Sequence, residues 1–202
     1  MPKLFSTQLT LDRCPHCNVD MPTLNWISAQ IETTDYAGAN KRFWRFYRCV
    51  RCGGVITASA KAVDQEILEL FPSGITTDSN IPQRAKAFLD QAINSLNSPA
   101  GAVMLAASAV DAMLKAKSYR EGSLYARIDK AVQDHVITSE MGKWAHDVRL
   151  DANDQRHADE DAPLPTSDDA RRAIDFVLAL GQFMFVLPAK VQKGIADAQQ
   201  KR

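Results

Sequence analysis

The sequence predicts an α+β protein in which a small N-terminal β module precedes an all-α bundle of about five helices. Two observations predict this division. All four cysteines fall within the first 52 residues, around a segment rich in aromatic and β-branched residues that is typical of strands. After Pro72 and Gly74 the apolar residues recur with the 3.6-residue period of helices. The predicted domains are 1–62 for the β module and its extended exit segment, 63–80 for a linker and 81–202 for the bundle.

The cysteines form two C-x2-C pairs, "CPHC" and "CVRCGG". Each pair places two thiolates on one tight turn, and two such turns supply the four ligands of a tetrahedral structural zinc site. Two disulfides or a redox C-x-x-C are the alternatives, but neither suits two pairs in a protein expected in the cytoplasm. We therefore expect one Zn²⁺ per chain in a zinc ribbon, bound by Cys14, Cys17, Cys49 and Cys52, with His16 at the surface.

Between the two pairs, "TLNWISAQIE" and "RFWRFYRC" flank a Gly- and Asn-containing turn, which predicts a hairpin. The second arm interleaves arginines with aromatic residues, and this combination binds the phosphates and bases of single-stranded nucleic acid. The alternative is that the aromatic residues dock the ribbon onto a protein surface while the arginines face solvent. The candidate nucleic-acid-binding residues are Arg42, Trp44, Arg45, Phe46 and Arg48.

Five helices are expected in the bundle. The first spans about 82–97 with one apolar stripe, and the second spans about 100–117 and is apolar nearly all round, as a central helix is. The third spans about 124–136, and the fourth begins near Thr138 and Ser139. The fifth follows Thr166 and Asp169, which have capping-box spacing, and runs to Pro188 before a short polar segment.

The fourth helix carries a row of polar residues beside its expected buried stripe, which includes Trp144 and Val148. At 100° per residue, Arg149, Asn153 and His157 share one face with spacings of four residues. A guanidinium, an amide and an imidazole in one row suit phosphate binding or acid–base catalysis. These three residues are the candidate catalytic residues.

A structural role for Arg149 is the alternative. Asp111 is the one charge on the apolar second helix before its end, and a partly buried carboxylate needs a cationic partner. The sequence therefore also predicts a structural pair between Asp111 and Arg149.

Composition excludes several classes of function. Lys and Arg equal Asp and Glu at 24 each, so the net charge gives no general attraction to nucleic acid or membranes. This average conceals a basic N-terminal part, because residues 1–61 carry eight Lys/Arg and four Asp/Glu. Without a signal peptide or a long apolar run, we expect a cytoplasmic protein that does not bind membranes. Common enzyme motifs are absent, and Asp159, Glu160 and Asp161 are expected in a solvated acidic loop.

The order "LFPSG", "IPQRAKAFLDQAI", "AGAVMLAASAVDAMLKAK", "SLYARIDKAV" and "VITSEMGKWAHDVRLDANDQRHA" resembles the bacterial family called domain of unknown function 4145. Arg149, Asn153 and His157 match its motif Arg-x-x-Gly-Asn-x-x-x-His, with Ala152 in place of the glycine. The resemblance implies a prokaryotic protein of the kind met beside restriction and anti-phage systems, with a HEPN-like bundle. Many HEPN proteins are metal-independent ribonucleases with an Arg and a His four to six residues apart, whereas here seven residues separate Arg149 and His157.

The function expected from the sequence is that of a zinc-binding interaction module of a prokaryotic system. Its ribbon would bind nucleic acid, as a single strand or RNA, or a partner protein, and its helical bundle would form a homo-oligomer. The alternative is a ribonuclease effector that uses Arg149, Asn153 and His157. Whether the protein is an enzyme stays open on the sequence, with a binding role favoured.

Overall fold

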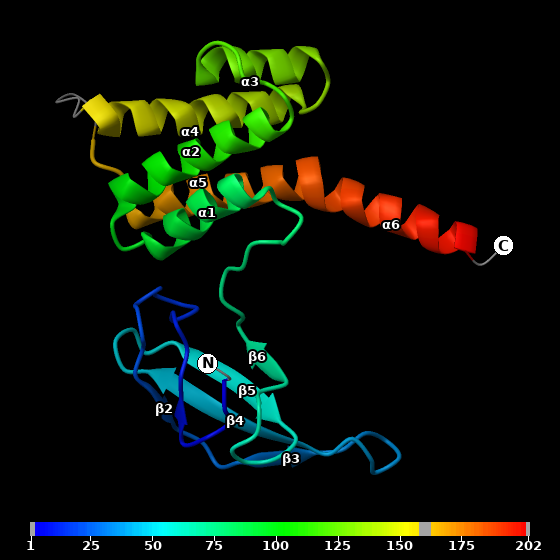
Figure 1. The fold of residues 1–202 in the computed structure, drawn as a ribbon. Coiled ribbons are helices and arrows are strands. Elements are labelled where there is room, and N and C mark those ends of the chain that lie inside the picture. Colours follow the sequence, from blue (N-terminus) through cyan, green and yellow to red (C-terminus); the bar gives the residue numbers. More distant parts are fainter. Residues whose placement is uncertain (1–2, 158–162, 201–202) are drawn as a thin grey trace. The chain divides into compact units, whose positions relative to one another are not determined.

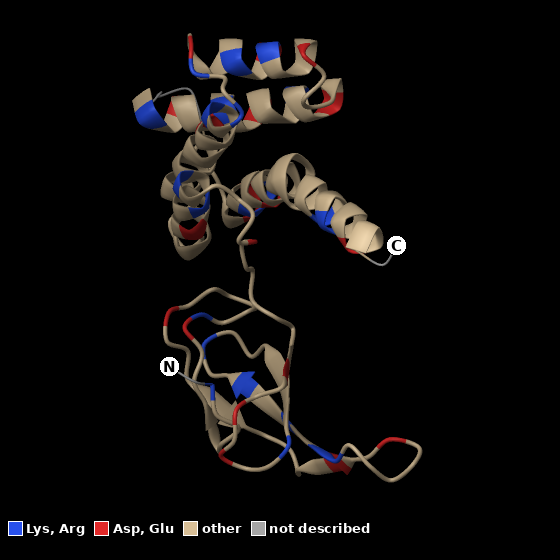
Figure 2. Ribbon diagram, turned by 45° about the vertical axis from the view of Figure 1, so that its right-hand side comes forward, with Lys and Arg blue, Asp and Glu red and all other residues tan. Residues whose placement is uncertain are grey.

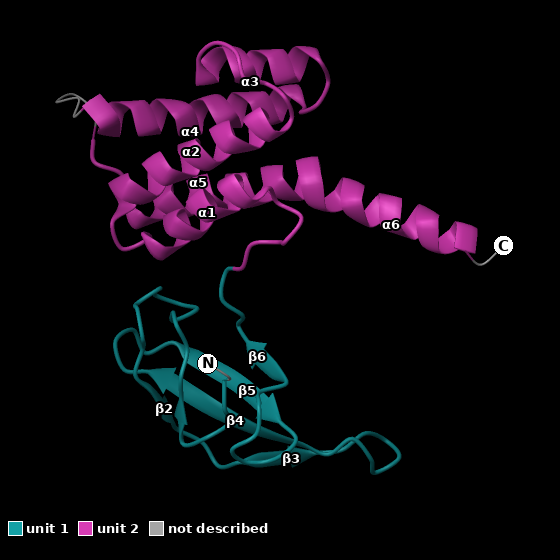
Figure 3. Ribbon diagram, in the orientation of Figure 1, with its two compact units in different colours: residues 1–75 teal, residues 76–202 magenta. Residues whose placement is uncertain are grey.

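The computed structural model describes residues 3–157 and 163–200. The chain divides into two compact units, residues 1–75 and residues 76–202 (Figure 3). The first contains an antiparallel sheet and the second contains helices, which confirms the predicted α+β class. The predicted acidic loop at 159–161 lies outside the described residues.

The first unit is built on one antiparallel sheet whose centre is the long strand β4, Arg42–Cys49 (Figure 1). The strand order is β1-β2-β4-β5-β6. Strand β3 pairs with the same edge of β4 as β2 does: β2 pairs with the C-terminal end of β4 and β3 with its N-terminal end. The remaining strands are β1 (Gln8–Leu9), β2 (Leu24–Trp26), β3 (Ile31–Thr33), β5 (Val55–Ala60) and β6 (Glu69–Phe71). Since β2 and β3 both pair with β4, the hairpin predicted between the cysteine pairs is present.

Strand β6 lies within the segment 63–80 that the sequence analysis assigned to a linker. It pairs with β5 over three residues, with Thr57 opposite Phe71 and Ser59 opposite Glu69. Only the three residues "ELF" join the edge of the sheet. A strand this short shows no clear period-2 pattern in the sequence, so the pattern did not indicate it. The sheet unit therefore continues to about Ile75.

One face of the sheet is buried and the other is open. On the inner face, Tyr47, Ile56 and Ala58 are fully buried beneath the N-terminal segment, which contributes Phe5. The Tyr47 hydroxyl donates a hydrogen bond to the carbonyl oxygen of Ser6 at 2.7 Å, which fixes that segment on the inner face. The core of this unit is thus one layer between the sheet and the N-terminal segment.

The second unit packs its helices around α2 (Pro99–Ala116), which contacts α1, α3, α4 and α5. This central position explains why α2 is apolar nearly all round. The surrounding helices are α1 (Gln83–Asn94), α3 (Leu124–Gln133), α4 (Ser139–His157) and α5 (Ser167–Gly181). Gly142 allows α3 and α4 to approach closely, because a Cβ atom there would lie 2.5 Å from a methyl group of Val132.

The last helix differs from the prediction that it ends at Pro188. A π-helical turn at Gln182–Val186 follows α5, and α6 (Leu187–Gln200) then continues through Pro188 (Figure 1). Proline lacks an N–H and its ring clashes with the carbonyl four residues earlier. The wider turn directly before Pro188 accommodates the proline, so the helix continues. Counting this continuous helix once, the described residues contain five helices, as predicted.

Among the described residues, two helices are long and apolar enough to cross a membrane by length and composition alone, Pro99–Ala116 and Ser167–Gln200. The core helix of a soluble protein passes the same test, and α2 lies at the centre of the helical unit.

Trp144 on α4 was expected in the buried stripe but is 42% exposed. It instead packs on Phe176 at the edge of the core, with ring centroids 4.9 Å apart.

Candidate functional site

The four cysteines converge in the first unit. Their sulfur atoms all lie within 4.8 Å of one another, and Cys14 Sγ and Cys52 Sγ are 3.9 Å apart. Tetrahedral coordination at a Zn–S distance of about 2.3 Å places sulfurs about 3.8 Å apart. All four cysteines are free of disulfide bonds. The cluster therefore has the dimensions and the ligand chemistry of a site for one metal ion.

Backbone hydrogen bonds shape the two cysteine turns. The N–H of Asn18 donates to the carbonyl of Cys14, and the N–H of Gly53 donates to that of Cys49, both at 2.9 Å. Gly53 has a φ of +75°, a backbone conformation that residues with a Cβ atom rarely adopt. His16 is exposed, and its Nε2 lies within hydrogen-bond distance, 2.8 Å, of the carbonyl oxygen of Val55. The ring therefore lies at the surface and contacts the backbone, as expected for a residue that is not a metal ligand.

The sulfurs cannot all ionise easily without a cation. Burial raises the pKa of Cys14 to about 12. Burial acts in the same direction on Cys49, but backbone N–H groups of Cys52 and Arg51 lower the pKa of that thiol. Only deprotonated thiols bind metal, so a soft divalent cation would supply the charge that stabilises four adjacent thiolates.

Arg45 is not an exposed nucleic-acid-binding residue, which corrects the sequence-based expectation. Its side chain is only 4% exposed and its guanidinium lies over the rings of Phe5 at 4.6 Å and Trp26 at 4.3 Å. Its Nε and Nη2 both donate to Oε1 of Gln30, at 3.1 and 2.8 Å. Arg45 lies on the inner face with Tyr47, so its role is structural.

The other four candidate nucleic-acid-binding residues share the open outer face of the sheet. Alternation along β4 places Arg42, Trp44, Phe46 and Arg48 on this face. Register then adds apolar neighbours from the adjacent strands, because each directly paired residue points the same way. These neighbours are Ile31 opposite Trp44, Val55 opposite Arg48, and Phe71 beside Thr57.

We call these residues the outer aromatic face: Ile31, Arg42, Trp44, Phe46, Arg48, Val55 and Phe71. Phe71 is 55% exposed and Val55 is 44% exposed. Arg48 is exposed and forms no ion pair with any described residue. Arg42 is paired with Glu69 at 3.2 Å, and the indole N–H of Trp44 donates to Thr33 Oγ1 at 2.9 Å. The face therefore presents apolar rings with a free guanidinium at one end.

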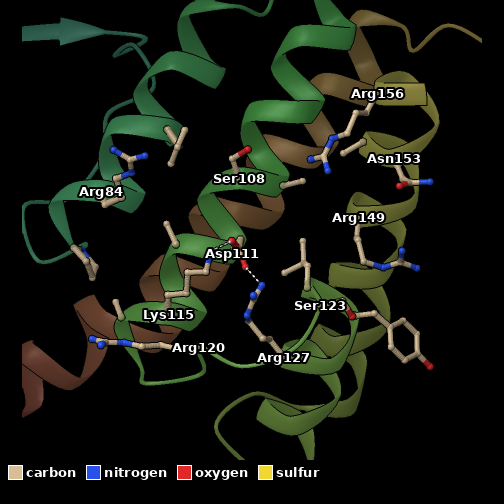
Figure 4. Close-up of a pocket in the computed structure, with 18 residues that line it drawn as sticks. Arg84, Ser108, Asp111, Lys115, Arg120, Ser123, Arg127, Arg149, Asn153 and Arg156 are labelled. Atoms are coloured by element: carbon tan, nitrogen blue, oxygen red, sulfur yellow. Dashed lines mark hydrogen bonds and ion pairs between the residues drawn. The ribbon is translucent and has the colours of Figure 1, made fainter. Parts of the chain in front are cut away.

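The second unit contains a basic cleft of about 830 Å³ between α1, α2, α3 and α4 (Figure 4). The described residues that line it include six cationic side chains and one carboxylate, that of Asp111, which together carry a net charge of +5. The cations are Arg84, Lys115, Arg120, Arg127, Arg149 and Arg156. Acidic and basic residues are otherwise interspersed over these helices, so this concentration of positive charge is local (Figure 2).

Asp111 pairs with Arg127 and Lys115, not with Arg149, and the predicted structural pair is wrong. Both ion pairs have a nitrogen–oxygen distance of 2.5 Å. Lys115 lies one turn along α2, and Arg127 reaches across from α3 and also donates to the carbonyl of Gly122 at 2.6 Å. In Figure 4 the guanidinium of Arg149 points away from Asp111.

Arg149 instead stacks on a ring of α3. Its guanidinium carbon lies 5.4 Å from the centroid of Tyr125, and its buried Nε has no hydrogen-bond partner. Asn153 also lines the cleft, whereas His157, at the last residue of α4, is exposed and is not among the described lining residues. The structure thus brings two members of the predicted row to the cleft and leaves the third outside it.

Sequence reasoning missed most of the cleft. Its cations come from α1, α2, α3, α4 and the loop between α2 and α3, and each alone has the pattern of a surface charge. The local signals all lie on α4, where Arg149, Asn153 and Arg156 share one face. Phe71 was missed because its strand lies in the expected linker.

Comparisons with known proteins identify the helical unit. No curated protein and no solved structure matches the chain. A family profile described as "Domain of unknown function (DUF4145)" matches residues 81–199, which include α1 to α5, all of α6 except its last residue, and every described residue that lines the cleft. The match covers more than half of the chain, and the chain belongs to this family of DUF4145 proteins.

Proposed function

We propose that this protein is a non-enzymatic zinc protein whose N-terminal unit binds single-stranded nucleic acid through the outer aromatic face. The observation that carries the proposal is the arrangement of this face: Trp44, Phe46 and Phe71 present rings on one side of the sheet, with Arg48 free beside them. Bases stack on such rings regardless of sequence, and a guanidinium binds the adjacent phosphate.

Zinc has a structural part in this proposal. Bound by Cys14, Cys17, Cys49 and Cys52, it would hold the turn before β5 against the turn after β1. Arg48 and Val55 lie next to Cys49 and Gly54 at this end of the sheet. The metal would therefore fix the end of the outer aromatic face without touching the nucleic acid.

A titration of the full-length, zinc-loaded protein into a fluorescently labelled single strand of about 15 nucleotides tests the proposal. We expect anisotropy to rise with a salt-dependent affinity. Phe71→Ala should weaken binding about tenfold by removing one stacked base, since such stacking contributes about 1–3 kcal/mol. Arg48→Ala should reduce the slope of log affinity against log salt by about one phosphate contact.

Lys3→Ala is the matched control. Lys3 is exposed and belongs to the N-terminal segment that covers the inner face, so the same change in charge should leave the affinity nearly unaltered. Binding that Phe71→Ala and Arg48→Ala leave unchanged would overturn the proposal. So would a protein that binds no single strand at low salt, and in that case the face would be a surface for docking a partner protein.

The geometry does not favour the ribonuclease alternative. Proton transfer to a ribose 2′-hydroxyl needs a group that can act as a base near pH 7 within hydrogen-bond reach. None of the described residues that line the basic cleft is a histidine, and Asp111 is engaged by Arg127 and Lys115. Catalysis by Arg149, Asn153 and His157 stays a prediction from the sequence alone, as do HEPN kinship and a role in defence.

Self-association, the second predicted partnership, has a candidate surface in α6. This helix buries none of its residues, and Leu187, Val191 and Ile195 form an exposed apolar row at intervals of four residues. A groove of about 490 Å³ lies beside the row. The proposal of a homo-oligomer therefore places the contact on α6, where a second copy would remove this apolar row from water.

A further inference from the structure

We infer that the basic cleft of the helical unit is a binding site for a ligand that carries two or more phosphate groups. This site is separate from the outer aromatic face, because every lining residue lies between Pro82 and Arg156. It is also separate from any catalytic role of His157. The inference rests on the charge of the cleft, on the free state of its arginines and on unpaired buried N–H groups.

The charge of the cleft is not balanced by the protein. The only carboxylate among the described lining residues, Asp111, neutralises one of two cations that contact it, Lys115 and Arg127. Arg84, Arg120 and Arg149 form no ion pair with any carboxylate in the part of the chain that the structure describes. Cations gathered at one place repel one another, so an anionic ligand would relieve the repulsion.

Two of the arginines are held in place by stacking on aromatic rings. The guanidinium of Arg84 lies over the ring of Phe88 at 4.9 Å, and that of Arg149 lies over Tyr125 at 5.4 Å. Stacking occupies the face of a guanidinium and leaves its N–H edge available for two parallel hydrogen bonds to phosphate oxygens. Such preorganisation lowers the entropy lost when a ligand binds.

Buried donors without acceptors point the same way. The Nε atoms of Arg127 and Arg149 are buried and have no hydrogen-bond partner in the protein. Buried N–H groups in folded proteins are normally satisfied, so a cleft with two unsatisfied guanidinium donors lacks acceptors that a ligand or its bound water would supply.

The dimensions of the cleft favour several phosphates over one. Its volume of about 830 Å³ is within the range of small-molecule sites. Figure 4 shows Arg84 and Arg156 on opposite sides of Ser108, while Arg120 lies toward the other end of the cleft beside Lys115. A single small anion cannot contact cations spread over this length. A polyphosphate chain or two neighbouring phosphates of a sugar–phosphate backbone match the spread.

The experiment compares two phosphate sources with the full-length, zinc-loaded protein. Isothermal titration with inorganic tripolyphosphate tests a free polyphosphorylated ligand, and anisotropy with a labelled single strand tests a backbone. The test variant is Arg84→Gln with Arg120→Gln, because both side chains are exposed and unpaired with acid, so their loss should not affect folding. We expect this double variant to weaken binding of at least one of the two probes by about tenfold or more per arginine removed.

Lys143→Gln is the first control, since Lys143 is an exposed cation on α4 that does not line the cleft. Phe71→Ala with Arg48→Ala is the second, because it removes the outer aromatic face and should leave tripolyphosphate binding intact. If only tripolyphosphate binding depends on Arg84 and Arg120, the ligand is a free phosphorylated molecule. If the single strand depends on them, the source is a backbone.

The inference fails if the protein binds neither probe, or if the double variant binds both as tightly as the wild type and as Lys143→Gln. Failure of the outer aromatic face gives a different pattern, in which Phe71→Ala and Arg48→Ala have no effect on the single strand while the cleft variants do. The two proposals can therefore succeed or fail separately.

Discussion

The two units of this protein obtain their stability in different ways. The described residues of the sheet unit contain a core cluster of ten buried apolar residues, and two of these are the cysteines Cys14 and Cys49. The helical unit contains a cluster of twenty-nine. Small domains bury too little apolar surface to fold securely and often use a metal instead. We therefore propose that a metal ion at the cysteine cluster completes the small core of the sheet unit, whereas the larger apolar cluster stabilises the helical unit by itself.

The units also use arginine–aromatic contacts for opposite purposes. In the sheet unit, Arg45 lies between Phe5 and Trp26 and is buried, so no anion from solvent can reach it. In the helical unit, Arg84 lies over Phe88 and is exposed in a cleft. An arginine over an aromatic ring is a structural contact in the first case and, as we propose, a binding group in the second. Burial, rather than residue type, decides which.

The largest expected effect tests the metal dependence. Removal of zinc with a strong chelator under reducing conditions should unfold the sheet unit and leave the helices folded, because structural zinc contributes about 10–16 kcal/mol in small zinc domains. Amide NMR spectra should lose the dispersed signals of β4 and β5 and retain those of α2. Metal analysis of the untreated protein should give about one zinc per chain.

Cys49→Ser is the matched variant, because it removes one ligand sulfur and changes the side-chain volume little. It should mimic chelation even when zinc is in excess. A sheet unit that stays folded after chelation, or thiols found oxidised in two disulfides, would contradict the comparison and leave the small core as the source of stability.

The cysteine site could be predicted from the sequence because C-x2-C spacing is local. Strand alternation in the sequence also indicates the direction of the Arg45 side chain. Arg45, Tyr47 and Cys49 share one face, and a cysteine expected to bind an internal metal marks that face as the inner one. The cysteine spacing and the strand register together therefore indicate that Arg45 is a buried residue and not a surface one.

The partner of Asp111 could not be predicted in the same way. A helical wheel shows which face of α2 carries Asp111 but not which neighbouring helix lies against it. Arg127 on α3 and Arg149 on α4 were equally suitable in sequence, and the crossing of α2 with α3 decided between them. The cleft shares this property, since five separate segments assemble it.

A smaller effect is expected at Asp111, within the helical unit. Arg127→Ala removes a 2.5 Å ion pair and leaves a partly buried carboxylate to Lys115 alone. Hydrogen bonds to charged groups contribute about 1.5–3 kcal/mol, and the side chain of Asp111 is 23% exposed, so we expect a loss of about 2 kcal/mol in the free energy of unfolding. Urea denaturation followed by helical circular dichroism measures it.

Arg149→Ala is the matched control for this prediction. Arg149 stacks on the exposed ring of Tyr125 and forms no ion pair with Asp111, so its removal should cost less than about 1 kcal/mol. Equal losses of stability in the two variants, or a larger loss for Arg149→Ala, would contradict the pairing of Asp111 with Arg127.

The smallest expected effect concerns the start of α5. Thr166 and Asp169 form a reciprocal capping box: the Asp169 N–H donates to Thr166 Oγ1 at 3.3 Å, and the Thr166 N–H donates to Asp169 Oδ2 at 2.7 Å. Thr166→Ala should lower the free energy of unfolding by about 1 kcal/mol, whereas Thr166→Ser keeps the hydroxyl and should cost less.

Hydrogen bonds from Thr166, with Arg172 nearby, hold the pKa of Asp169 below its usual value of 3.8. The contribution of the ionised carboxylate is therefore complete above pH 3.8 and is lost as the pH falls through the lower folded-state value. Thermal unfolding followed from pH 7 to acid pH should show the difference between Thr166→Ala and the wild type narrowing at the acid end, where the carboxylate is protonated and only the hydrogen bond from the Asp169 N–H to the hydroxyl remains. A difference that is constant over this range would show that the hydroxyl, and not the charged half of the box, stabilises the helix start.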